Sequence, residues 1–282
     1  MKYELTNETK AVNGKNLFRI RALRDFGTVK AGDLGGWVES ESNLAQLETC
    51  WVYDEAQVSG RAQVYGEAQV SGEARVFGEA WVSGSAQVYD EAQVYGEARV
   101  YGEARVFGEA WVSGEAWVSG SARVYGEARV SGRAQVYGEA QVSGSARVFG
   151  EARVFGEAWV SGEAWVYGGA QVSGRAQVYG EARVYGEAQV SGEAWVSGSA
   201  QVSGEAYIKS VADYIVVGPA QSSGRFTTAY IVENSIVVTT GCFTGTLEEF
   251  KLAIEKTHGH NPSYLKQYRG FANFIGENFE TL

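Results

Sequence analysis

Residues 103–120 read EARVFGEAWVSGEAWVSG, three copies of one six-residue unit of the form E-A-x-V-x-G. Ala occupies every sixth position over residues 56–206, and Val does so over residues 52–202, with 26 of each. The matching Gly position, over residues 60–204, is interrupted only by Asp90. A chain that repeats its sequence at a short fixed period repeats its structure, so this stretch predicts a solenoid.

Ala and Val lie two residues apart, so in an extended segment they face the same side and the residue between them faces away. The unit is too short for a strand and a helix, which leaves a short strand and a bend. Gly permits the bend because it reaches φ > 0 without a Cβ clash, and Asp54 and Asp90, which replace it, tolerate that conformation. Three bends close a triangular coil of 18 residues, and coils stack about 4.8 Å apart.

The repeat resembles the hexapeptide signature of left-handed parallel β-helices, in which an aliphatic residue and a small residue four positions later face the core. The resemblance covers roughly 180 of the 282 residues and implies an all-β solenoid of about ten coils. Its left hand, an exception to the usual right-handed crossover, comes from the family alone. Acyltransferases, carbonic anhydrase relatives, ice-binding proteins and inert scaffolds share this coil, so the fold does not fix a function.

Charge and composition narrow the class of partner. The net charge is −10, and residues 54–205 hold −9 of it, from 18 Glu and 2 Asp against 11 Arg. A nucleic-acid-binding surface has the opposite sign, so direct nucleic-acid binding is not expected. Cys50 and Cys242 are predicted to be buried thiols without a disulfide. The start of the chain has no apolar signal segment, and no window reaches a membrane span, so we expect a cytoplasmic protein without membrane contact.

Three regions follow from the pattern: an N-terminal cap at 1–37, the solenoid at 38–217 and an α/β module at 218–282. Residues 18–24 alternate as a basic strand that would cover the open edge of the first coil. In the module, residues 226–240 predict a hairpin turning at Glu233-Asn234.

Two helices complete the predicted module. A capping box at residues 246–249 starts a helix that runs to about Lys256, and Asn261-Pro262 starts a second helix. Both ends of the chain resemble phage- and prophage-encoded hexapeptide-repeat proteins. The resemblance rests on RIRAL at 19–23, AGDLGGW at 31–37 and GCFTGTLEEF at 241–250, and it implies a phage origin but no reaction.

Two positions of each unit face outward: the residue between Ala and Val, and the residue after Val. Most units have an aromatic ring at only one of these two positions. Sorting by 18 places Arg99 between Trp81 and Trp117, and aligns Arg147 with residues 165 and 183 on another face. Such stacks allow cation–π contacts of about 0.5–1 kcal/mol each. The candidate binding residues are Trp81, Arg99, Trp111, Trp117, Arg147, Trp159, Trp165, Arg183 and Trp195. One interpretation is that these groups only cover one another on a narrow rod; the other is a partner-binding or self-associating surface.

A row of glutamates follows one corner of the predicted triangle at one residue per coil: Glu73, Glu91, Glu109 and Glu127. Like charges about 4.8 Å apart repel by roughly 1 kcal/mol per pair even in water. The row is either a solvated corner or an imitation of duplex phosphates that captures a DNA-binding protein.

The sequence offers few groups for catalysis. Acyltransferases of the resembled family use a coil histidine and protruding loops that hold a thioester cofactor, and its zinc enzymes use several coil histidines. Here His258 and His260 are the only histidines, and both lie outside the repeats, where they are expected to end a helix. We therefore predict no enzyme activity, no catalytic residue, no metal and no cofactor.

The resulting hypothesis is a phage-type interaction or structural protein that presents an acidic, aromatic-decorated rod to a protein partner. It would be a scaffold, a virion part or an inhibitor of a host system, with self-association through the module or the coil faces. The alternative is an acyltransferase-like enzyme or a small-ligand binder.

Overall fold

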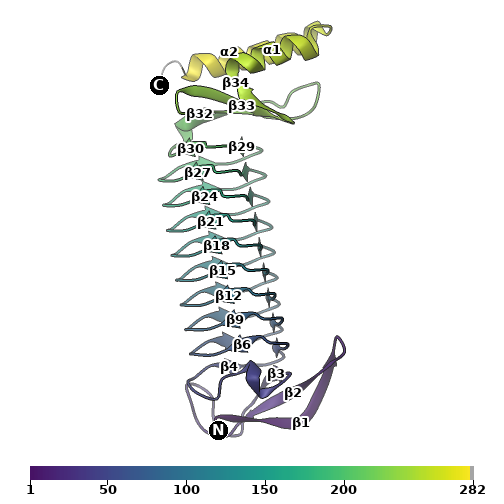
Figure 1. The fold of residues 1–282 in the computed structure, drawn as a ribbon, viewed down its shortest axis with the longest axis vertical. Helices are drawn as coiled ribbons and strands as arrows, with labels where there is room; N and C mark the ends of the chain where they lie inside the picture. The colour runs from purple at the N-terminus through teal and green to yellow at the C-terminus, as the bar shows by residue number, and fades with distance from the viewer. Residues whose placement is uncertain (280–282) are drawn as a thin grey trace.

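The computed structural model describes residues 1–279 and is a parallel β-solenoid of about ten coils, capped at both ends (Figure 1). Each strand of the rod is an outward residue followed by Val or Ile. The strands run from β4 (Trp51–Val52) and β5 (Gln57–Val58) at six-residue intervals to β30 (Tyr207–Ile208). The all-β solenoid prediction is confirmed.

Three parallel sheets form the faces of the rod. We name them face 1 (β4, β7 and every third strand to β28), face 2 (β5 to β29) and face 3 (β6 to β30). A bend follows each strand and consists of Gly, or Asp, and the residue after it. The bends after faces 1, 2 and 3 form corners 1, 2 and 3, respectively. Every residue therefore lies beside the one 18 positions away, as Arg99 lies beside Trp81 and Trp117.

Ala and Val fill the interior, and none of those in the regular repeat is more than 1% exposed. Backbone hydrogen bonds join each coil to the next in parallel ladders. Gln57 N donates to Ala74 O at 2.9 Å, and Ser59 and Arg61 donate in the same way to the next coil. In the regular repeat the N–H of the outward residue thus faces the next coil, and the carbonyl groups of Ala and Val face the preceding one.

The corners have the expected left-handed backbone, with φ of 72° at Gly150, 51° at Asp54 and 59° at Asp90. Coils approach closely here, since a Cβ on Gly150 would lie 3.0 Å from the backbone nitrogen of Gly168. The two aspartates add a contact that the sequence did not suggest. The Asp90 carboxylate accepts a hydrogen bond from Gly108 N in the next coil at 3.1 Å, and Asp54 does the same.

The N-terminal cap consists of β1 (Tyr3–Val12), β2 (Lys15–Ala22), β3 (Leu34–Val38) and the 3-10 turn η1 (Glu41–Asn43). β1 and β2 form an antiparallel hairpin that leans away from the rod, and β3 joins face 2 in parallel with β5 (Figure 1). The predicted cap strand is confirmed as β2.

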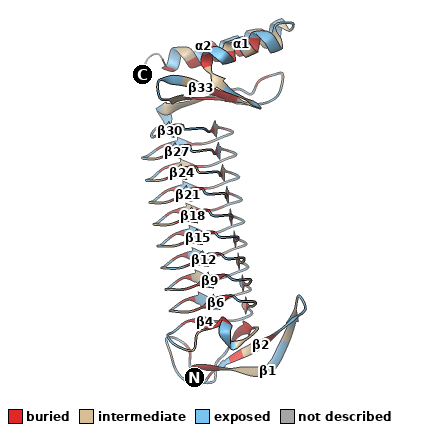
Figure 2. Cartoon of the chain, viewed as in Figure 1, coloured by how far each residue is buried: buried red, intermediate tan, exposed pale blue. Residues whose placement is uncertain are grey.

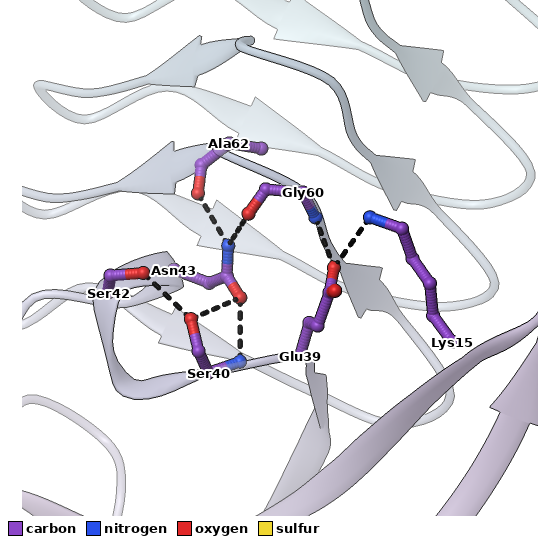
Figure 3. Close-up of polar contacts among 7 residues, drawn as sticks. All are labelled: Lys15, Glu39, Ser40, Ser42, Asn43, Gly60 and Ala62. Carbon is purple, nitrogen blue, oxygen red and sulfur yellow. Dashed lines mark hydrogen bonds and ion pairs between the residues drawn. The ribbon is translucent and has the colours of Figure 1, made fainter.

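Polar side chains close the first coil in Figure 3. The buried Asn43 donates from Nδ2 to Gly60 O at 3.0 Å and Ala62 O at 2.9 Å. Glu39 accepts from Gly60 N at 2.6 Å and from Lys15 Nζ at 2.8 Å. These bonds pair backbone groups that have no coil beneath them, which would otherwise cost free energy.

The C-terminal module begins at η2 (Val211–Asp213). Its antiparallel sheet contains β31 (Tyr214–Val217), β32 (Thr227–Val232), β33 (Ser235–Thr240) and β34 (Phe243–Thr246). Helices α1 (Leu247–His258) and α2 (Pro262–Phe279) lie on the side of the sheet away from the rod, with their buried residues toward the sheet (Figure 2). The predicted hairpin, capping box and two helices are confirmed, whereas the boundaries at 37 and 217 stay predictions.

The module also closes the last coil. Gln201 N donates to Thr228 Oγ1 at 2.9 Å, and Ser203 N donates to the Tyr230 hydroxyl at 3.2 Å. Both acceptors are side chains of β32 and are almost fully buried. The sheet therefore supplies the oxygens that another coil would have supplied.

Two sequence-based expectations about burial need comment. Cys50 is a buried free thiol as predicted, but Cys242 is exposed, because it lies in the tight turn between β33 and β34. Trp51, at an outward repeat position, is only 1% exposed because it packs against Tyr3 and Phe26 of the cap. Within residues 1–279, no helix has the length and apolar character needed to span a membrane.

Candidate functional surfaces

The predicted tryptophan–arginine stacks are present. On face 3 the Arg99 guanidinium lies 5.2 Å from the Trp81 ring and 5.3 Å from the Trp117 ring. On face 2 Trp165 lies between Arg147 and Arg183, at 5.0 and 5.1 Å. Each such contact stabilises exposed coils by about 0.5–1 kcal/mol.

The other members of the candidate set lie on two faces. Trp111 pairs with Arg129 at 4.6 Å on face 2, and Arg129 lies beside Arg147, so Trp111 belongs to the same row as Trp165. Trp159 and Trp195 lie on face 1, where Gln177 separates them, and they are 42% and 49% exposed. The nine residues are thus spread over all three faces, which favours mutual cover of neighbouring side chains over a single aromatic binding site.

Rings that follow Val form a second kind of stack. Phe149, Tyr167 and Tyr185 lie face to face at 4.9 and 5.0 Å, and Phe107 stacks between Tyr89 and Tyr125 at 4.8 and 5.0 Å. Because the ring faces contact one another, the side of each stack offers ring edges. A ligand that needs an open aromatic face, such as a base or a sugar, finds none along the side of these stacks.

The three corners differ in charge. At corner 1, Glu73, Glu91, Glu109 and Glu127 follow one another without an intervening cation, and none of the four forms an ion pair within the described chain. A groove of about 420 Å³ runs along this corner from Asp90 to Ser145. The predicted acidic row is therefore continuous along one edge of the rod.

Basic residues interrupt the other two corners. At corner 2, Arg133 contacts Glu115 at 3.2 Å and Glu151 at 3.5 Å. At corner 3, Arg175 contacts Glu157 at 3.3 Å and Glu193 at 3.7 Å. Their carboxylates are partly neutralised, which leaves corner 1 as the strongly acidic edge.

Corner 1 is anchored to the cap at Glu55. Its carboxylate accepts from Lys10 Nζ and Arg19 Nη1, both at 2.9 Å, and from the Trp37 indole at 3.0 Å. The hydrogen bond from Lys10, with those from Trp37 and Arg19, lowers the pKa of Glu55 to about 2, although desolvation opposes this. This carboxylate fastens the hairpin to the rod and is not free to bind a partner.

A pocket of about 510 Å³ lies in the C-terminal module, between the residues before β32, the β33–β34 turn and the two helices. His258, the last residue of α1, stacks on Tyr268 with ring centres 4.6 Å apart. The sequence argument placed His258 correctly at a helix end but did not find this pocket. The residues that line it are far apart in the sequence and meet only when the helices pack on the sheet.

Comparison with known proteins supports the repeat architecture. A family model described as "YdcK Beta solenoid repeat" matches four stretches of the rod, residues 68–84, 98–114, 122–138 and 188–204. A protein of Escherichia coli K12 named "Uncharacterized acetyltransferase YdcK" is 38% identical over 66 residues. The match spans 21% of this chain and 20% of that protein. A hexapeptide-repeat-like β-helix is therefore supported.

The same match corrects one prediction. From the missing coil histidines we predicted no enzyme activity, and similarity to a protein named as an acetyltransferase contradicts that prediction. The argument gave His258 no role beyond ending a helix, whereas His258 also lines a pocket of the module.

Proposed function

We propose that the rod binds a basic segment of a partner protein along corner 1. The supporting observation is the carboxylate row from Glu73 to Glu127, in contrast to corners 2 and 3, where Arg133 and Arg175 partly neutralise the row. The half-buried stack of Tyr89, Phe107 and Tyr125 borders the same row. Its ring edges would contact the aliphatic stems of Lys or Arg while the carboxylates pair with the cationic ends.

Charge spacing decides which kind of basic partner fits. The corner carries one charge per coil, about 4.8 Å, whereas duplex DNA carries one per roughly 1.7 Å of its axis. The glutamate row therefore has about a third of the charge density of a DNA duplex and is a poor mimic of its phosphates. An extended Lys- or Arg-rich peptide, whose residues are spaced about 3.3 Å apart, can place a cation near each carboxylate.

The test is a binding titration with a fluorescent octalysine peptide. Exposed ion pairs contribute about 0.2–1 kcal/mol each, so replacing Glu73, Glu91, Glu109 and Glu127 by Gln should weaken binding by about 0.8–4 kcal/mol, which is at least about fourfold. The matched control replaces four glutamates of corner 2 by Gln: Glu79, Glu97, Glu115 and Glu151. An equal loss in both variants would show that only net charge matters and would refute the proposal.

A deletion variant separates position from composition. Removing one unit, residues 97–102 (EARVYG), moves Glu109 and Glu127 to another corner while the Ala and Val interior stays in phase. Removing residues 151–156 (EARVFG) shortens the rod equally and leaves the acidic row intact. We expect the first deletion to weaken octalysine binding and the second to preserve it.

Acyl transfer is a second candidate, favoured by the similarity to the protein named as an acetyltransferase. Incubation with acetyl-coenzyme A and a panel of small amines, with release of the free thiol as readout, tests it. Turnover that is lost in His258→Gln would assign the activity to the module, and absence of turnover with every amine would argue against this candidate. A phage origin, a cytoplasmic location and self-association stay predictions.

A further inference from the structure

The pocket of the C-terminal module has the size and walls of a small-molecule site. Its volume of about 510 Å³ lies within the range of roughly 300–1,000 Å³ that is usual for such sites. Residues from four separate segments line it, including Phe243 of β34, Phe250 and Ile254 of α1 and Tyr268 of α2. It is separate from the acidic corner and independent of the binding proposed there, and it shares His258 with the acyl-transfer candidate.

The floor of the pocket is apolar and held in place. Phe250 and Ile254 are each 3% exposed and Tyr268 is 6% exposed. The Tyr268 hydroxyl hydrogen-bonds Ser222 Oγ at 2.9 Å, and its ring is stacked against His258. A ligand body placed here would meet fixed rings and a branched aliphatic side chain, which suits a flat apolar group.

The rim carries cationic and hydroxyl groups. Arg225, His258, Thr240 and Thr257 line the pocket, and no Asp or Glu is among its lining residues, in a chain of net charge −10. The Arg225 guanidinium has no ion-pair partner among residues 1–279. Its donors are therefore available to an anion.

Gly241 makes room for this arginine. A Cβ at Gly241 would lie 2.4 Å from Arg225 Nη1 and 3.3 Å from its Cδ. The side chain is thus laid across a backbone position that only glycine leaves open, where Arg225 lines both this pocket and a neighbouring cleft that contains Glu181. Arginine recognises a carboxylate through two parallel N–H donors.

We propose that this pocket binds a small monocarboxylate with a flat apolar body, with the carboxylate on Arg225 and the body on the Phe250–Ile254–Tyr268 floor. One available guanidinium matches one carboxylate, and the cationic rim excludes amines. For a ligand of about ten heavy atoms we expect a Kd on the order of 0.1 mM.

The chain contains a natural reporter for this site. Cys242 lines the pocket and is exposed, whereas Cys50 is fully buried. Burial raises the pKa of the Cys50 thiol, which further suppresses its reactivity. A thiol reagent should therefore label Cys242 selectively in the folded protein, and a bound ligand should slow that labelling.

The experiment uses 3-phenylpropanoate as the probe. Binding is measured by saturation-transfer NMR, and its location is measured by the labelling rate of Cys242 in the intact chain. 3-Phenylpropanol has the same body without the charge, and acetate has the charge without the body. We expect 3-phenylpropanoate to bind and to slow labelling several-fold at millimolar concentration, and the two control compounds to do neither.

Variants assign the interactions. Arg225→Gln should weaken 3-phenylpropanoate binding at least about tenfold, and Arg225→Lys should retain part of the affinity. Arg61→Gln, at an exposed arginine of the rod, should change nothing. Ala253→Phe, which fills the pocket, should abolish binding in a protein whose circular dichroism matches the wild type.

Three results would overturn the proposal. They are the absence of saturation transfer at 10 mM probe, equal binding of the alcohol, and unchanged affinity in Arg225→Gln.

Discussion

Replacing a corner glycine by alanine should cost most where two coils meet. Gly150 and Gly204 both have positive φ, 72° and 64°, so alanine at either position incurs about 1–2 kcal/mol of left-handed strain. At Gly150 the new Cβ would also lie 3.0 Å from Gly168 N, whereas at Gly204 nothing lies within 4 Å. Overpacking of this kind costs about 1–3 kcal/mol. We expect losses of about 2–5 kcal/mol for Gly150→Ala and about 1–2 kcal/mol for Gly204→Ala.

A larger residue at the same position should do less harm. Asp90 shows that a carboxylate at a corner accepts the glycine N–H of the next coil at 3.1 Å, and a hydrogen bond to a charged group contributes about 1.5–3 kcal/mol. Gly150→Asp places aspartate before Glu151, the same Asp-Glu order as at Asp90. Gly150→Asp should therefore be at least about 1 kcal/mol more stable than Gly150→Ala.

Native-state hydrogen exchange read by mass spectrometry is the suitable assay, because each coil contacts only its neighbours and opens locally. The free energy of opening should fall in the coils that contain residues 132–168 and stay unchanged near the N-terminal cap. Equal losses in Gly150→Ala and Gly204→Ala would refute the argument from close approach. A loss in Gly150→Asp as large as in Gly150→Ala would refute the argument from the carboxylate.

Three further outcomes follow from individual contacts. Tyr230→Phe leaves the buried N–H and Oγ of Ser203 without their partner, so the free energy of unfolding of the C-terminal module should fall by about 1–3 kcal/mol. An unchanged melting temperature would contradict this. Arg99→Gln should cost about 1–2 kcal/mol in denaturant because it loses two cation–π contacts, and Arg153→Gln, whose face neighbours are both glutamine, should cost less. The carboxyl pKa of Glu55 is lowered from 4.5 to about 2. Its contribution to stability is therefore present above pH 4.5 and is lost as the pH falls toward 2. Melting temperatures of Glu55→Gln should therefore fall less between pH 6 and pH 2 than those of the wild type, and parallel curves would show that the carboxylate contributes nothing.

Much of the rod could be predicted from its sequence because period and side-chain size determine it. Ala and Val two residues apart predicted the buried interior, and an interval of 18 predicted that Arg99 lies between Trp81 and Trp117. These results depend on spacing alone, and spacing is visible in the chain.

Other features depend on contacts between distant segments. The sequence analysis described the acidic row of one corner, and the structure adds that ion pairs of Arg133 and Arg175 partly neutralise the other two corners. The exposure of Cys242 and the position of Arg225 over Gly241 depend on how the module packs. No periodic signal marks them.

Because the strands of successive coils run parallel, the two bare ends of the rod differ, and the last coil of one rod can pair with the first coil of another. At one end Trp37 N of the cap donates to Ala56 O, and at the other end the Tyr230 hydroxyl accepts from Ser203 N. Each cap therefore pairs the backbone groups that another coil would pair. A rod stripped of both caps would join head to tail into open filaments, because such a contact does not close on itself. A rod that keeps either cap would offer identical copies no complementary end and would not join them.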